Sequence, residues 1–324
     1  MREYPFELAM CAAVEAESPG IVARQLGSHT RIVDVVEVLP GSEFDDRTAI
    51  TPESIPDLAI ESDVGVGRAR YWKDAFGSDI DPDRARSAVD RALKIGFFEA
   101  ERRNGREYVR QTARYPEWVG GLRAFENKPD LDRPGDLELQ LRKDVSLSLF
   151  DEVVLVTDSY VTGAHLNRIP DAVGIHRFDA ETGDVEIVRE PIPLPTDEPG
   201  IAVLDEHVAR VDIEPVTAAE KSRLRRRIAE RAYGKGWRPD SFPACAKAST
   251  RGPEFREEGA LPYCAWKGRL VDPARECGPD CGGYDPADPP QANPEAVRAE
   301  RSAWEPDPDG ERRRQAGLDR FGEE

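Results

Sequence analysis

The sequence predicts a mixed α/β protein, with a small unit inserted between two strands and a cysteine-rich segment behind the core. Outside residues 48–114, the expected elements follow the order helix, strand, strand, strand, helix, strand, which suits a mixed sheet flanked by helices. The insertion itself reads as a helix followed by a hairpin. Four of the five cysteines fall within residues 239–284.

Hydrophobic spacing predicts the first three core elements. Pro5–Glu17 is expected to be a helix, because apolar residues recur at helical spacing after a proline that suits the first turn. Ile21–Leu26 is a short strand candidate. Arg31–Gly41 is β-branched and apolar, is interrupted by two acidic residues, and stops at Pro-Gly, so it reads as a strand.

The insertion, residues 48–114, begins with two weakly helical stretches. A stronger helix should run from Asp81, a good N-cap before proline, to Gly96. Asn104-Gly105 between two β-rich runs is a strong hairpin signal. A helix followed by an arginine-bearing hairpin is typical of a winged helix, and the alternative is any small helical insertion with a hairpin. The residues expected to contact DNA are Arg84, Arg86 and Arg106.

The core resumes after the insertion, so it spans residues 1–47 and 115–195. Gly121–Lys128 reads as a strand, Asp136–Leu149 as an amphipathic helix and "FDEVVLVTDS" as a buried strand. Residues 196–238 are a connector with a basic helix, and residues 239–284 are the cysteine segment. Residues 285–324 are acidic and proline-rich with little apolar spacing, so we expect a disordered tail.

Acidic residues dominate the 324-residue chain. The 63 acidic side chains outnumber the 45 basic ones, the net charge is −18, and only 8 of the basic residues are lysines. This composition resembles proteins of salt-loving archaea. Molar salt screens charges within about 3 Å, so the net charge does not exclude DNA as a partner. No apolar run approaches the roughly 20 residues of a membrane span, and the N-terminus lacks a signal peptide's basic region, so we expect a cytoplasmic protein without a membrane partner.

Three residues on the expected strands suggest a metal-dependent hydrolase. Glu126 and Lys128 are two apart and project from the same face of their strand. Asp34 would join them if its strand pairs with theirs. Two carboxylates can hold a hard divalent cation that activates water, and a lysine can stabilise the developing negative charge. The alternative is a strand-end salt bridge of these carboxylates with Lys128 or Arg31.

The order of the elements and these residues resembles the PD-(D/E)XK nuclease superfamily over about residues 1–45 and 116–195. "ENK" at Glu126–Lys128 matches its (D/E)-x-K element, and "RIVD" resembles the strand that carries its aspartate, here Asp34. "FELAMCAAVE" resembles its first helix, with Glu7 as the expected metal-facing glutamate and Glu15 in reserve. "LELQLRKD" resembles the helix where RecB-type members place a glutamine, here Gln140. The resemblance implies a restriction-endonuclease-like αβββαβ core and Mg²⁺ or Mn²⁺ as cofactor.

The sequence departs from the family pattern in two ways. The literal Pro-Asp is absent at Asp34, and 91 residues separate Asp34 from Glu126, so the insertion must loop out from the strand ends. Pro56-Asp57 and "ESDVG", which contains Asp63, could hold the acidic ligand instead. The four histidines show no ligand spacing, and no phosphate-binding or dinucleotide fingerprint is present.

The four C-terminal cysteines have the arrangement of a metal site. Eighteen, twelve and three residues separate Cys245, Cys264, Cys277 and Cys281. Four thiolates in a reducing compartment most simply surround Zn²⁺, and a [4Fe–4S] cluster or four unrelated thiols are the alternatives. Cys11 lies in the first helix and is expected to be buried packing.

The leading functional hypothesis is a Mg²⁺- or Mn²⁺-dependent DNA nuclease acting in repair, restriction or recombination. The second is a catalytically silent, nuclease-like regulator that binds DNA through the insertion. The third is an interaction protein organised by its metal segment, without nucleic acid. The oligomeric state stays open, a homodimer included.

Overall fold

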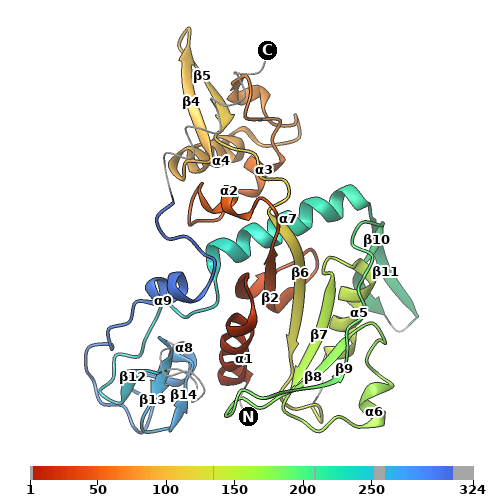
Figure 1. The fold of residues 1–324 in the computed structure, drawn as a ribbon, viewed down its shortest axis with the longest axis vertical. Coiled ribbons are helices and arrows are strands. Elements are labelled where there is room, and N and C mark those ends of the chain that lie inside the picture. The colour runs from red at the N-terminus through yellow and green to blue at the C-terminus, as the bar shows by residue number, and fades with distance from the viewer. Residues whose placement is uncertain (1–2, 134, 208, 252–259, 309–324) are drawn as a thin grey trace.

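A six-stranded mixed sheet forms the centre of the computed structural model, which describes residues 3–133, 135–207, 209–251 and 260–308 (Figure 1). The strand order is β1-β2-β6-β7-β8-β9. The β6–β7 and β7–β8 pairs are parallel and the others antiparallel. This confirms the expected mixed sheet. The strands are β1 (Ile21–Gly27), β2 (Ile32–Pro40), β6 (Val119–Asn127), β7 (Glu152–Thr157), β8 (Gly174–Phe178) and β9 (Val185–Arg189).

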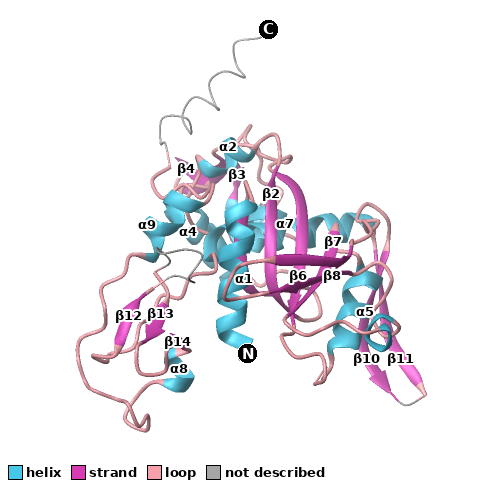
Figure 2. Ribbon diagram, turned by 60° about the horizontal axis from the view of Figure 1, so that its bottom comes forward, coloured by secondary structure: helices cyan, strands magenta, loops and turns pink. Residues whose placement is uncertain are grey.

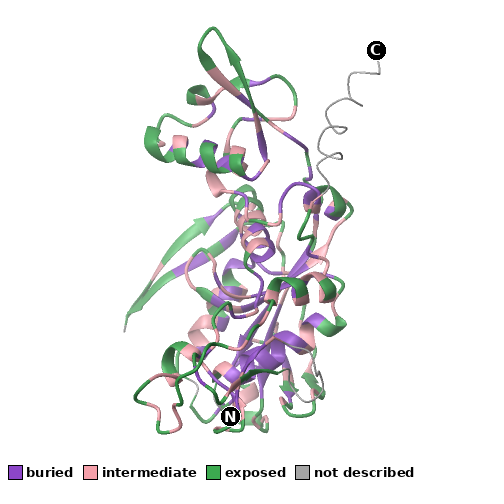
Figure 3. Ribbon diagram, turned by 90° about the vertical axis from the view of Figure 1, so that its left-hand side faces the viewer, coloured by how far each residue is buried: buried purple, intermediate pink, exposed green. Residues whose placement is uncertain are grey.

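Helices flank the sheet on both faces, as expected. Along β6, alternate side chains point to opposite faces, so Phe125 packs in the cluster that contains α1 (Glu3–Glu17), whereas Ala124 packs in the opposite cluster. That second cluster includes Leu141 of α5 (Leu137–Leu147) and Ile228 of α7 (Ala218–Lys235). Buried residues are accordingly concentrated in the sheet (Figure 3). The basic helix α7 thus covers the sheet and is not merely a connector.

The insertion between β2 and β6 contains a helix followed by a hairpin, as predicted, and stands apart from the sheet (Figure 1). Its small sheet has the order β3-β5-β4. Asn104 and Gly105 at the hairpin turn have φ values of 49° and 75°, the left-handed region that an Asn-Gly turn provides. The weakly helical stretches become α3 and a short strand with a 3-10 helix. The elements are α2 (Phe44–Thr48), α3 (Asp57–Glu61), β3 (Arg70–Tyr71), η1 (Trp72–Asp74), α4 (Pro82–Lys94), β4 (Phe98–Arg103) and β5 (Arg106–Gln111).

A second hairpin, β10 (Gly200–His207) and β11 (Arg210–Val216), was not expected from the sequence. Its apolar side chains do not alternate cleanly with polar ones about a buried face, since Ile201, Leu204 and Ile213 are all exposed. The hairpin lies beside α5. A short helix, α6 (Gly163–Leu166), precedes β8.

The cysteine segment forms its own three-stranded sheet, which lies next to α1 (Figures 1 and 2). Leu261 and Leu270 of this segment share a buried cluster with Phe6 of α1. The segment therefore packs against the helix that covers the main sheet. Its elements are β12 (Ala248–Thr250), β13 (Pro262–Cys264), β14 (Arg269–Leu270) and α8 (Pro273–Glu276).

The expected disordered tail differs from the structure over residues 285–308. A helix, α9 (Pro294–Arg301), is followed by Trp304, which is buried in the main core and donates from its indole nitrogen to the Pro52 carbonyl at 3.0 Å. The guanidinium carbon of Arg298 lies 4.5 Å from the centroid of the Trp304 ring. One tryptophan can anchor a polar segment without producing any apolar periodicity. Residues 309–324 lie outside the described residues.

Among the residues described above, none of the helices has the combination of length and hydrophobicity that a membrane span requires.

Candidate active site

The pairing of β2 with β6 brings Asp34 and Glu126 to neighbouring positions. Val35 pairs with Phe125, so Asp34 and Glu126 are the next residues along the two strands. The backbone nitrogen of Asn127 donates to Oδ2 of Asp34 at 3.0 Å, which fixes the carboxylate against β6. The other end of this pairing, Pro40 with Val119, is where the insertion leaves and returns. The 91-residue separation is therefore compatible with the predicted juxtaposition.

Glu7 of α1 lies at the same end of the sheet. Arg24 donates to its Oε1 and Gln25 to its Oε2, both at 2.8 Å. The Gln25 amide also donates to Asp34 at 3.3 Å, so one side chain links the two carboxylates. The reserve candidate Glu15 instead accepts hydrogen bonds from Trp237 and Arg238. Of the two glutamates, only Glu7 reaches the site.

Glu126 forms a salt bridge, and its partner is Arg31. Nη2 of Arg31 donates to Glu126 at 2.8 Å, while Nε of the same guanidinium donates to Asp144 of α5 at 3.0 Å. Lys128 does not pair with Glu126; its ammonium lies 3.8 Å from a carboxylate oxygen of Glu3, and its side chain is 26% exposed. The salt-bridge alternative is thus realised between Glu126 and Arg31.

Acidic groups outnumber arginines among the described residues of this buried site. Arg24 and Arg31 lie among four carboxyl groups, of which three are buried and one is half-buried. Burial raises the pKa of Glu126 to about 8; Arg31 opposes this rise and the negative charge of Asp34 adds to it. Burial also raises the pKa values of the other three carboxyl groups. The four carboxylates are those of Glu7, Asp34, Glu126 and Asp144.

Gln140 occupies α5 one turn before Asp144 and is half-buried. Among the described residues no hydrogen bond of its side chain is found, so it borders the site without contacting the carboxylates. Asp144, Arg24 and Gln25 were missed from the sequence. The four-residue spacing from Gln140 to Asp144 places both on one helix face and could have identified Asp144.

The alternative acidic candidates lie elsewhere. Asp57 begins α3 and forms an ion pair with Arg231 of α7. Asp63 is exposed and pairs with Arg70 at 3.0 Å. Asp34 is among the charges that act most strongly on the pKa of Glu126. Asp34 is therefore the acidic neighbour of Glu126.

The arginines expected to contact DNA differ in their surroundings. Arg86 is already engaged: it pairs with Asp90 and Glu107, and its guanidinium carbon lies 5.2 Å from the centroid of the Trp72 ring. Arg84 is exposed, and no ion pair of its side chain is found in the described part of the chain. Arg106 is exposed and lies 5.5 Å from the centroid of the Tyr71 ring.

Within the described residues, no three His, Cys, Asp or Glu side chains are arranged as the ligands of a metal ion. A magnesium ion does not need three, because it commonly binds one or two carboxylates and keeps several waters. Asp34 and Glu126 satisfy that smaller requirement. When both are deprotonated, Arg31 compensates their negative charge in part, and a divalent cation would offset the rest.

One protein family matches most of the chain. The model of "Family of unknown function (DUF5787)" matches residues 21–286, which include β1 to α8 and all four C-terminal cysteines. No curated protein and no solved structure matches the chain.

Proposed function

The chain belongs to the DUF5787 family, whose function is unknown, and we propose that it is a metal-dependent DNA nuclease that hydrolyses phosphodiester bonds. One observation carries the proposal: in the described part of the chain, four carboxyl groups meet two arginines at one buried end of the sheet. Burying charge without a counter-ion is costly. Because burial raises the pKa of all four carboxyl groups, a divalent cation that binds here would displace protons from them and supply positive charge in their place.

Asp34 and Glu126 would hold Mg²⁺ or Mn²⁺, with Glu7 close enough to interact electrostatically with Asp34. When bound, such an ion activates a water and neutralises charge on the phosphate. Asp144 retains Arg31 through its own hydrogen bonds if Glu126 turns away from the guanidinium. The chain thus has a way to release Glu126 without leaving Arg31 unpaired.

Lys128 would orient the attacking water or stabilise the developing negative charge. It is partly exposed, and its ammonium interacts only loosely with Glu3 at 3.8 Å. A flexible lysine at this separation can turn from Glu3 to a bound phosphate at little cost, because surface ion pairs contribute about 0–1 kcal/mol.

Cleavage assays test these assignments. We expect the protein to cleave DNA with Mn²⁺ in concentrated KCl, and Lys128→Ala to reduce the rate about 100- to 1,000-fold, as loss of a charge-stabilising donor does. Glu126→Gln should abolish cleavage. The matched control is Glu37→Gln, a buried glutamate on β2 that pairs with Arg123. Cleavage that survives both site substitutions would exclude this site.

The insertion would act as a winged helix that holds the DNA. Its order, α3, β3, η1, α4 and then the β4–β5 hairpin, is that of a winged helix, and Arg84 and Arg106 are exposed on its helix and hairpin. Exposed arginines suit phosphate contacts. Replacing both by alanine should weaken DNA binding, whereas Arg110→Ala should not, since Arg110 is already paired with Glu99.

A catalytically silent DNA-binding protein is the second candidate, and the Arg31–Glu126 ion pair favours it. In such a protein Arg31 would replace the metal permanently as the counter-ion of Glu126. DNA binding would then be unaffected by chelators and no cleavage would occur with any divalent ion. The same assays therefore distinguish the two candidates.

A further inference from the structure

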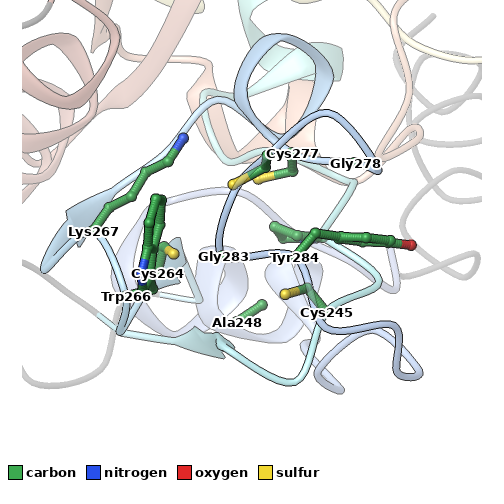
Figure 4. A pocket seen from close by; sticks show the side chains of 11 residues that line it. Cys245, Ala248, Cys264, Trp266, Lys267, Cys277, Gly278, Gly283 and Tyr284 are labelled. Carbon is green, nitrogen blue, oxygen red and sulfur yellow. The ribbon is translucent and has the colours of Figure 1, made fainter.

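Four cysteines of the C-terminal segment surround one small cavity (Figure 4). They come from separate parts of the segment: Cys245 before β12, Cys264 at the end of β13, Cys277 after α8, and Cys281 in the following turn. All four are free thiols. The charges of Cys264 and Cys281 both act on the Cys277 thiol, which indicates that these groups are near one another.

The backbone around the cavity is tightly turned. The Gly268 nitrogen donates to the Cys264 carbonyl at 2.8 Å, and the Cys281 nitrogen donates to the Gly278 carbonyl at 3.0 Å. A Cβ added at Gly283 would lie 2.3 Å from the Trp266 ring, so only glycine allows the tryptophan to lie against this turn. Trp266 also lines the cavity. These turns bring cysteines that are far apart in sequence to one place.

The segment has little other stabilisation. Its strands are two or three residues long, and among its described residues the buried apolar side chains are few, chiefly Leu261, Leu270 and Val271. Segments this small usually need a disulfide or a metal to fold. Because all four cysteines are free thiols, no disulfide between them stabilises the segment.

Positive charge lies beside the thiols. Lys267 lines the cavity, and the charges of Cys264 and Cys277 act on Arg269. Both cations are held in place by Glu276, at 3.2 Å for Lys267 and 2.5 Å for Arg269. A divalent ion with four thiolate ligands carries two net negative charges, which neighbouring cations offset.

We infer that Cys245, Cys264, Cys277 and Cys281 bind one Zn²⁺ that stabilises the fold of this segment. The cavity between them, about 20 Å³, is close to the space of a single water molecule. Four thiolates from one short segment are a usual ligand set of a structural Zn²⁺. Among the described residues the four thiols line the cavity but are not arranged as a completed ligand set, so binding of the ion would draw them closer together.

Metal analysis of the full chain tests the inference. The protein is purified under reducing conditions, stripped of metal with a chelator, titrated with Zn²⁺ against a chromophoric chelator, and separately loaded with Co²⁺. We expect one tightly bound Zn²⁺ per chain, and Co²⁺ spectra with thiolate charge-transfer bands and the visible bands of tetrahedral coordination. Cys277→Ser and Cys281→Ser should each lose this tight site. Cys11→Ser, which changes the buried cysteine of α1, is the control and should retain it.

Three results would overturn the inference. The first is that the metal-free wild-type protein does not bind Zn²⁺ tightly. The second is that both serine variants still bind Zn²⁺ tightly. The third is that the purified protein is brown and contains stoichiometric iron and sulfide. The last would assign the thiols to an iron–sulfur cluster. If the ion stabilises the fold, a chelator should lower the thermal stability of the wild-type protein but not that of the serine variants. An incidental ion would leave the thermal stability of the wild-type protein unchanged. None of these readouts depends on nuclease activity.

Discussion

Burial and two neighbouring charges together set the pKa of Glu126. Burial favours the protonated acid, Arg31 favours the carboxylate, and Asp34 favours the acid again, with the result that the pKa is raised to about 8. An unfolded glutamate has a pKa near 4.5. The folded protein therefore binds a proton at Glu126 that the unfolded chain has already lost at neutral pH.

The pH dependence of stability follows from this difference. Because the folded state binds the extra proton, the contribution of Glu126 to stability is present below about pH 4.5 and is lost as the pH rises toward about 8. Glu126→Gln cannot titrate, so its free energy of unfolding should fall less over this range. Denaturant unfolding in EDTA at several pH values measures the difference. Parallel curves for wild type and variant would contradict the raised pKa.

Among the elements, α7 is joined to the start of the insertion by a buried ion pair. Arg47 of α2 and Glu230 of α7 are both fully buried and 2.7 Å apart. The guanidinium carbon of Arg47 lies 4.1 Å from the centroid of the Tyr233 ring, and Arg47 also donates to the Thr51 carbonyl at 2.9 Å. This pair orients the insertion at its exit from the sheet.

Removing one partner of this ion pair should destabilise the fold more than removing both. Glu230→Leu leaves Arg47 buried without its counter-ion and should lower the free energy of unfolding by about 3–5 kcal/mol. The double variant Arg47→Met, Glu230→Leu should lose much less than the sum of the two single changes. Denaturant unfolding of the four proteins forms the test, with Arg110→Met of an exposed pair as control. Additive losses would show that the pair is not coupled.

The elements that could be predicted from the sequence are those with clear periodicity. The helix at α1, strands β2, β6 and β7, and the β4–β5 hairpin all follow from apolar spacing or from Asn-Gly. The β10–β11 hairpin could not be predicted because several of its apolar residues, among them Ile201, Leu204 and Ile213, are exposed and blur the alternation. Of the site, Asp34, Glu126 and Glu7 were identified, but the network of Arg24, Gln25 and Asp144 depends on contacts between distant elements.

For the whole molecule, the last residues that the structure describes are part of the core. Trp304 is buried against the insertion's entry, and the backbone nitrogen of Glu305 donates to the Tyr233 hydroxyl at 3.2 Å. The end of the described chain thus returns to the centre of the fold. Composition indicated disorder here because a single anchor leaves no repeating pattern.

Replacing this anchor should destabilise the protein. Trp304→Ala should lower the free energy of unfolding by about 3–5 kcal/mol, the usual effect of truncating a large buried aromatic side chain. Tyr160→Ala, which removes an aromatic ring that is 76% exposed, is the control and should change little. Thermal and denaturant unfolding measure both. Equal stability of the Trp304 variant and wild type would support the disordered tail instead.

The central claim is that Asp34 and Glu126 share a divalent cation, and the most direct test is the affinity of the protein for Mn²⁺. Titration followed by electron paramagnetic resonance should show one Mn²⁺ site that is absent in Glu126→Gln and weakened at least about 10-fold in Asp34→Asn. Glu37→Gln should bind as wild type does. Equal Mn²⁺ affinity in wild type, Asp34→Asn and Glu126→Gln would contradict the claim and leave Arg31 as the counter-ion of Glu126.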